Sequence, residues 1–205
     1  DLGLIMPPKI APIQVVILPI FKKNEADNDI LLFAQNIEKI LSDNDISVKI
    51  DLDDAHTLGY KINEWELKGV PLRIEIGSKE MESKTVKAVR RDDFSKQDIP
   101  FDQIKEKVQV VLEDIQKSLF EKSLQMRNEK TKEANNYNDF KEYIEQGNLV
   151  RSFWCENKEC EQKIKEETSA TVRCLELDRA TLEENGKCVC CNNAAKNKWL
   201  FGKSY

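Results

Sequence analysis

The order of the predicted strands and helices indicates an α/β domain with a mixed sheet, followed by a smaller part that carries cysteines. Residues 13–20 form an apolar run rich in β-branched side chains, which is typical of a buried strand. The next segment repeats apolar residues at helical spacing, at Ile30, Phe33, Ile37 and either Ile40 or Leu41. A strand followed by an amphipathic helix begins a β-α-β unit, and this favours the α/β class.

The same alternation continues along the first half of the chain. Three prolines, at positions 7, 8 and 12, prevent a helix at the start. Short strands are predicted at 48–51, 72–76 and 84–91. Helices are predicted at 62–68, where Gly69 and Pro71 end the helix, and from Asp102 onward. The resulting order, β-α-β-α-β-β-α, predicts a compact domain of about a hundred residues.

A highly charged segment, residues 121–145, leads from this domain to the cysteines. We expect it to be a helix that packs through a narrow apolar stripe of Leu124, Phe140 and Ile144. Gly147 is expected to end it.

Four cysteines follow in the pattern Cys155-x4-Cys160 and Cys188-x2-Cys191. Each short pair can present two thiolates, and two such pairs complete the tetrahedron of a structural zinc site. The alternative is that these are ordinary core or free cysteines. Cys190 gives a second possible spacing and competes with Cys191 as the fourth ligand, whereas Cys174 lies outside both pairs and is expected in the core.

Composition limits the functional classes. A net charge of −5 argues against nucleic-acid binding through bulk charge, although a basic cluster could still contact phosphates. That cluster consists of Lys79, Lys84, Lys87, Arg90 and Arg91. No apolar run is long enough to span a bilayer, no secretory signal opens the chain, and six cysteines without one favour a reducing, cytoplasmic environment. Because the chain starts at Asp1 without Met, we expect it to be a fragment.

Two other polar features are weaker candidates for chemistry. His56, the one histidine of the sequence, could act as a general base, but in a loop beside Gly and Thr it is more often a turn residue. Asp51, Asp53 and Asp54 could bind a divalent cation, yet they lack the Gly and distal Glu of a calcium loop. Solvated carboxylates at the end of a strand are the simpler interpretation.

The segment from Gly59 to Lys79 contains a more specific pattern. Its helix, strand and following turn carry Glu66, Arg73 and Lys79, which we expect to converge on one edge of the sheet. A carboxylate can accept hydrogen bonds from guanine N1–H and N2–H, while Arg and Lys donate to O6 and N7. A salt-bridged surface would have the same composition.

At this point the sequence resembles the archaeal/eukaryotic-type prolyl-tRNA synthetase family. The resemblance rests on the motif D-x-H-T-x-G-Y-K at 54–61 and on W-E-L-K-G-V-P at 65–71, with further matches at both termini and around the cysteines. It implies a class II anticodon-binding domain, with a mixed sheet flanked by helices, and then a small α+β zinc-binding-like lobe. The implied boundaries are 1–12 for the junction with a catalytic domain, 13–118 for the anticodon-binding domain and 119–205 for the lobe with its linker helix.

The resemblance also implies roles for individual residues. Glu66, Arg73 and Lys79 would contact the two guanines shared by proline anticodons, and the carboxylate of Tyr205 would reach toward the active site. The catalytic domain of the parent chain, with its ATP and Mg²⁺, is absent from this sequence, so the fragment is expected to be inactive alone. The full enzyme is expected to be a homodimer that acts on tRNA(Pro). The alternative is a protein-interaction module that docks a partner through its sheet edge or zinc lobe.

Overall fold

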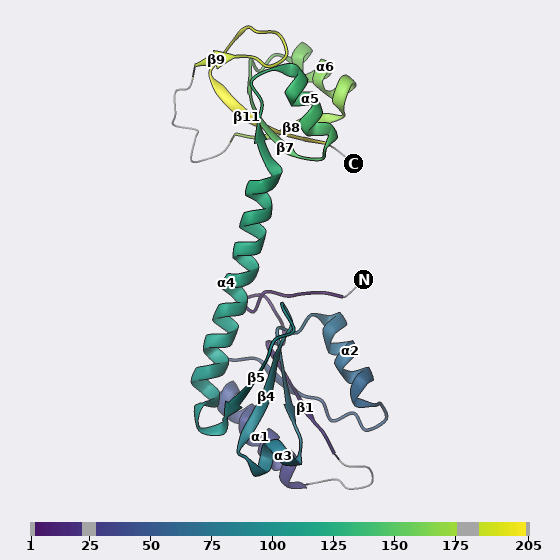
Figure 1. Ribbon diagram of the computed structural model, residues 1–205, viewed down its shortest axis with the longest axis vertical. Helices are drawn as coiled ribbons and strands as arrows, with labels where there is room; N and C mark the ends of the chain where they lie inside the picture. Colours follow the sequence, from purple (N-terminus) through teal and green to yellow (C-terminus); the bar gives the residue numbers. More distant parts are fainter. Residues whose placement is uncertain (1–2, 22–27, 176–184, 204–205) are drawn as a thin grey trace. The chain divides into compact units, whose positions relative to one another are not determined.

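The computed structural model describes residues 3–21, 28–175 and 185–203 (Figure 1). The chain divides into two compact units, Asp1–Lys122 and Ser123–Tyr205. The long helix α4 (Ile104–Lys130) contributes to both. The domain boundaries expected at 12/13 and 118/119 stay predictions.

The first unit is built on a five-stranded sheet with the order β2-β1-β3-β4-β5. Its strands are β1 (Val15–Pro19), β2 (Val48–Ile50), β3 (Leu72–Ile76), β4 (Thr85–Arg90) and β5 (Lys96–Pro100). β1 runs parallel to β2 and β3, whereas β4 is antiparallel to β3 and β5. The mixed α/β sheet that the sequence predicts is thus confirmed.

Helices cover both faces of this sheet. The main core joins one face to α1 (Asn28–Ser42) and α4, and it includes Val15, Ile17 and Ile74. Because side chains alternate along a strand, Val16 and Leu18 point to the opposite face, where they pack against Trp65 of α2 (Leu58–Lys68).

Helix α2 begins earlier than the sequence suggests. The hydroxyl of Thr57 accepts a hydrogen bond from the backbone N–H of Tyr60, so the helix starts at Leu58 rather than at residue 62. Gly69, with φ of 75°, ends it in the left-handed conformation. The short helix α3 (Ser78–Glu82), the 3₁₀ turn η1 (Phe101–Gln103) and strand β5 were not among the predicted elements.

The second unit has its own sheet and core. The order β6-β7-β11-β8 joins β6 (Thr131–Glu133), β7 (Leu149–Trp154), β11 (Asn197–Lys203) and β8 (Ala170–Cys174). A small hairpin pairs β9 (Gly186–Lys187) with β10 (Ala194–Ala195). The helices α5 (Tyr137–Glu145) and α6 (Lys158–Thr168) contribute Phe140, Ile144 and Ile164 to the core, which also contains Phe201 of β11.

The expected single helix over 121–145 is wrong. α4 continues to Lys130, β6 then pairs in parallel with β7, and a new helix starts after Asn136, whose side chain caps it. Phe140 and Ile144 are buried as expected, whereas Leu124, on α4, is only partly buried. None of the helices among the described residues is both long and apolar enough to cross a membrane.

Candidate nucleic-acid interface and candidate metal centre

Glu66 and Arg73 form an ion pair between α2 and β3. Nη1 of Arg73 donates to Oε1 of Glu66 at 2.7 Å. Nε of the same guanidinium donates to Oε1 of Glu75 at 2.9 Å. The side chains of Arg73, Glu75 and Glu66 are 11%, 15% and 26% exposed, so the cluster is held close to the protein surface rather than extended into solvent.

A buried arginine fixes the helix end that carries Glu66. Arg91 is only 3% exposed, and its Nε donates to the backbone carbonyl of Glu66 at 3.1 Å. Its backbone N–H donates to the carbonyl of Pro71, and its guanidinium lies 5.2 Å from the centre of the Phe94 ring. These contacts tie the last turn of α2 to the end of β4.

The structure brings together two of the three predicted base-reading residues. Lys79 lies on α3 and is exposed, and among the described residues it makes no hydrogen bond or ion pair with Glu66 or Arg73. The expected location was also wrong, because β3 is the central strand of the sheet rather than an edge. Arg73 lies beside Val16 in the register of β3 with β1, and Val16 packs against Trp65 of α2, so the pair lies on the sheet face that α2 covers.

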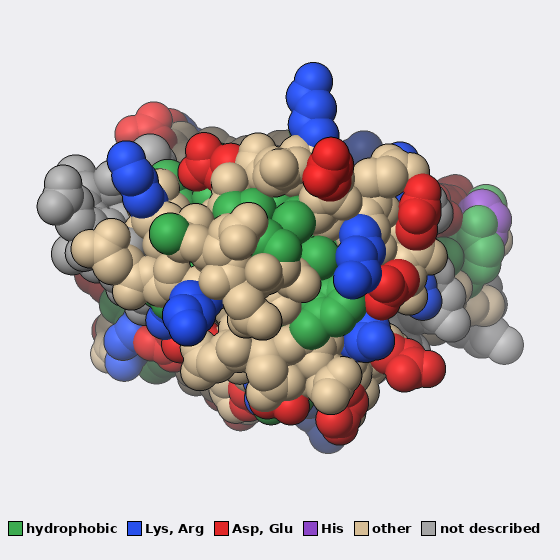
Figure 2. Space-filling view, turned by 90° about the horizontal axis from the view of Figure 1, so that it is seen from above, with side chains coloured by type: hydrophobic (Ala, Val, Ile, Leu, Met, Phe, Trp, Pro, Cys, Tyr) green, Lys and Arg blue, Asp and Glu red, His purple; other side chains and the backbone are tan. Residues whose placement is uncertain are grey.

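The expected basic cluster is not a continuous exposed patch. Arg91 is buried, and Arg90 forms two hydrogen bonds of 2.9 Å with the carboxylate of Asp92. Lys79 and Lys84 are exposed, whereas Lys87 lies 4.0 Å from Asp98. Figure 2 draws a different face, seen from above in the view of Figure 1, and there apolar side chains lie among scattered basic and acidic ones.

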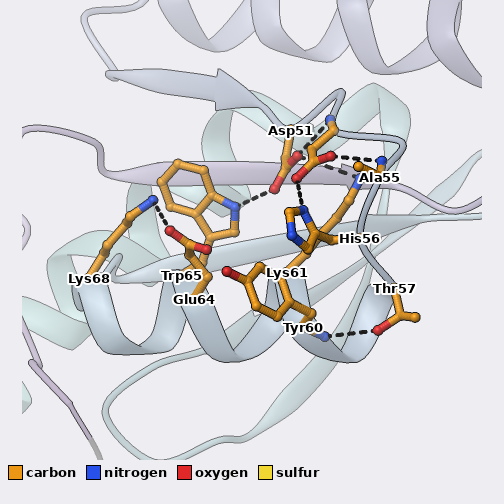
Figure 3. A network of polar contacts seen from close by, with 10 residues as sticks. Asp51, Ala55, His56, Thr57, Tyr60, Lys61, Glu64, Trp65 and Lys68 are labelled. Carbon is orange, nitrogen blue, oxygen red and sulfur yellow. Dashed lines mark hydrogen bonds and ion pairs between the residues drawn. The ribbon is translucent and has the colours of Figure 1, made fainter.

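The loop before α2 uses its acidic residues for local structure. Oδ2 of Asp51 accepts a 2.6 Å hydrogen bond from the indole of Trp65, and its other oxygen lies 3.5 Å from Nζ of Lys61 (Figure 3). Asp53 accepts from the backbone of Ala55 and pairs with His56. These contacts account for Asp51 and Asp53 without a cation.

Burial and hydrogen bonding act in opposite directions on Asp51. Burial raises the pKa of its carboxyl, but the Trp65 indole, the backbone N–H of Asp53 and the ammonium of Lys61 together outweigh burial and hold this pKa below its ordinary value. His56 stacks on Tyr60 with the ring centres 4.1 Å apart. A side chain stacked in this way and paired with Asp53 fits the turn role better than that of a general base.

Four cysteines of the second unit converge, and they are the four that the sequence pattern predicts. The sulfurs of Cys155, Cys160, Cys188 and Cys191 all lie within 4.8 Å of one another. Sγ of Cys155 is 3.7 Å from those of Cys160 and Cys191. Zinc–sulfur bonds of about 2.3 Å at tetrahedral angles would place sulfurs about 3.8 Å apart, whereas a disulfide needs about 2.05 Å. The thiols thus fit a metal ion, and all six cysteines are free.

Two turns position these sulfurs. Cys155 follows β7, and Cys160 lies in the first turns of α6, which the side chain of Asn157 caps. Cys188 follows β9, and the turn after it closes when the N–H of Asn192 donates to the carbonyl of Cys188 at 2.9 Å. This turn directs Cys191 into the cluster.

Cys190 and Cys174 lie outside the cluster of four sulfurs. Cys190 is partly buried but is not among the clustered sulfurs, so the geometry favours Cys191 for the fourth position. Cys174 is exposed at the end of β8, and its expected place in the core is therefore wrong. Tyr205, which was expected to reach toward an active site, lies outside the described residues.

Without a cation, burial disfavours most of the thiolates. Burial raises the pKa of Cys155 and of Cys160. Burial also acts on Cys188, but there the backbone N–H groups of Cys191, Cys155 and Cys190 outweigh it and lower the pKa to about 7. A metal cation held by these four sulfurs would displace the protons.

Comparison with known proteins finds a family match in each of the two units. Residues 14–110 match the family "Anticodon binding domain", and residues 137–205 match "Prolyl-tRNA synthetase, C-terminal". The chain carries an anticodon-binding domain and a prolyl-tRNA synthetase C-terminal domain. The chain is 41% identical to proline–tRNA ligase of Phocaeicola vulgatus over 208 residues, and 42% identical to that of Flavobacterium johnsoniae over 206 residues.

Both alignments cover all of this chain but only 42% of each relative's length. Prolyl-tRNA synthetase from Cryptosporidium parvum, solved as a complex with L-proline and AMP, is similar in structure. The TM-score is 0.92 and the identity 36%, over 99% of this chain and 43% of that one. The resemblance drawn from the motifs is thereby confirmed.

Sequence reasoning missed two residues of the Glu–Arg site. Glu75 lies two positions after Arg73 on β3, and the alternation Leu72-Arg-Ile-Glu-Ile76 already places both charged residues on one face. Arg91 was expected only as a member of the basic cluster that could contact phosphates. No sequence signal distinguishes it from Arg90, because its burial depends on how β4 meets α2.

Proposed function

We propose that this chain is the tRNA-reading part of a proline–tRNA ligase and that Glu66 and Arg73 read a guanine of the tRNA(Pro) anticodon. The observation that carries the proposal is the 2.7 Å contact between the two side chains in an anticodon-binding domain. A guanine presents two donors beside the O6 acceptor, so an adjacent carboxylate and guanidinium match its edges. Lys79, which stands apart from this pair, would contact the second guanine.

The whole enzyme would activate proline with ATP and Mg²⁺ and then transfer it to tRNA. This part of the proposal is supported by relatives that are called proline–tRNA ligases and share about 40% of their residues with this chain. The chain spans only about 42% of their length, so the catalytic domain would come from the remainder. The enzyme would be a cytoplasmic homodimer, with the carboxylate of Tyr205 directed toward its active site.

The four clustered cysteines would hold a structural Zn²⁺. Cys155, Cys160, Cys188 and Cys191 supply four sulfurs at spacings that suit tetrahedral coordination, and a closed four-thiolate site leaves no position open for substrate. The ion would stabilise the fold of the second unit by joining β7 and α6 to the turn after β9. It would take no part in the chemistry of aminoacylation.

Replacing Arg73 by lysine tests the reading role. The substitution keeps the positive charge but removes the planar fork, so binding through phosphates should persist while the preference for guanine falls. We expect discrimination between a proline anticodon stem-loop and one with adenines at the two guanine positions to fall by about 1–3 kcal/mol. Fluorescence anisotropy at several salt concentrations measures both quantities.

The matched control is Arg90→Lys. It makes the same chemical change on the same sheet, but Arg90 pairs with Asp92 instead of Glu66. This variant should keep the guanine preference. Equal binding of both stem-loops by the unaltered chain would contradict the reading role. That result would favour the alternative function, a protein-interaction module.

A further inference from the structure

Arg73 has a second carboxylate partner whose role the proposed function leaves open. Glu75 accepts a 2.9 Å hydrogen bond from Nε of Arg73 and is only 15% exposed. Its cross-strand neighbour is Lys87, yet Nζ of Lys87 lies 4.0 Å from Asp98. Within the described part of the chain, Arg73 is the ion-pair partner that the structure assigns to Glu75.

The hydrogen-bond inventory of the guanidinium shows what Glu75 does. Arginine has five N–H donors in one plane. Glu75 engages the single donor on Nε, and Glu66 engages one donor on Nη1, so the remaining donors lie on the two terminal nitrogens. A contact at Nε fixes the rotation of the plane, which a contact at Nη1 alone does not.

Glu66 cannot perform this task alone. In the proposed function its carboxylate accepts hydrogen bonds from the base, and this competes with its bond to Arg73. Glu75 is not assigned a contact with the base, so its hydrogen bond with Nε of Arg73 has no competitor. Both residues lie on β3, which keeps this hydrogen bond within one strand. The guanidinium then stays oriented while Glu66 turns to the base.

We propose that Glu75 is a specificity-determining positioning residue that orients the Arg73 fork for guanine. The inference rests on the proposed reading role of Arg73. A side chain held in its binding geometry loses less conformational freedom on binding and aligns its donors better with O6 and N7. Glu75 therefore affects the choice between bases more than the total affinity for RNA.

The test compares Glu75→Ala, Glu75→Gln and the control Asp98→Ala. Asp98 is 68% exposed on the neighbouring part of the sheet, and its replacement removes the same charge without touching Arg73. Both alanine variants lose one negative charge, so both should bind the adenine-substituted stem-loop slightly more tightly than the unaltered chain does. The readout is the dissociation constant for the adenine-substituted stem-loop divided by that for the guanine-containing stem-loop.

We expect Glu75→Ala to lower this ratio about tenfold, within the range that one bidentate contact confers. Glu75→Gln should restore most of it, because its amide oxygen still accepts from Nε, and Asp98→Ala should leave it unchanged. If Glu75→Ala does not fold, Glu75→Val, which suits a strand, should show the same loss. An unaltered ratio in a folded Glu75→Ala or Glu75→Val variant overturns the inference, whereas no guanine preference in the unaltered chain overturns the proposed function itself.

Discussion

Replacing Cys191 and Cys190 separately by serine tests the metal centre most directly. The two residues are neighbours in sequence, but only Cys191 contributes its sulfur to the cluster. A structural zinc stabilises a domain because it binds the folded state, so a weaker site lowers stability. If Cys191→Ser weakens zinc binding about 100-fold, the second unit loses about 2.7 kcal/mol.

The second unit has about 80 residues, and at that size each kcal/mol shifts the melting temperature by about 4–8 °C. Cys191→Ser should therefore lower the melting temperature of this unit by roughly 10–20 °C. Cys190→Ser, by contrast, should retain one zinc per chain and melt within a few degrees of the unaltered protein. Zinc released into a colorimetric chelator and thermal melting followed by circular dichroism measure the two effects. Loss of zinc from both variants, or from neither, would refute the assignment.

Two further predictions concern the packing of α2. Trp65→Phe removes the indole donor to Asp51 and should lower the free energy of unfolding by about 1.5–3 kcal/mol at neutral pH, measured by urea denaturation. Because the folded pKa of Asp51 lies below its ordinary value of 3.8, this contribution is fully present above 3.8 and is lost as the pH falls through the folded pKa, so the two proteins should converge in acid. Arg91→Met removes the donor to the Glu66 carbonyl and should lower the free energy of unfolding by about 1–3 kcal/mol. It should also weaken the preference for the guanine-containing stem-loop. Unchanged stability and preference would show that Arg91 does not fix the end of α2.

The sequence predicts those elements whose apolar residues follow a clear period. The helix α1 repeats Ile30 and Ile37 on its buried face, and β3 alternates strictly. By contrast, β5 has one fully buried residue, Ile99, and β6 has none, so neither shows an apolar pattern. Both strands form because a neighbouring strand offers backbone hydrogen bonds, and such tertiary pairing leaves little trace in a local window.

The candidate sites show the same division. Cysteine spacing predicts the cluster, but it leaves Cys190 and Cys191 equivalent until the turn closed by Asn192 distinguishes them. Similarly, the spacing along the helix, strand and turn predicts that Glu66, Arg73 and Lys79 converge, and the structure brings Glu66 and Arg73 together. Whether Lys79 joins them depends on where the short helix α3 lies. No residue of α3 is buried, so the sequence carries no apolar pattern that would predict its position.

The central position of β3 suits the reading role proposed for Arg73. An edge strand has hydrogen bonds on one side only, whereas β3 is paired with β1 on one side and β4 on the other. The backbone of Arg73 is therefore fixed in both directions, while Arg91 and the left-handed Gly69 fix the end of α2 that carries Glu66. A reading pair must hold its geometry before the base arrives, because ordering it on binding would reduce the difference between the correct and incorrect bases. A central strand meets this requirement, and for that reason the expected edge location was the less suitable one.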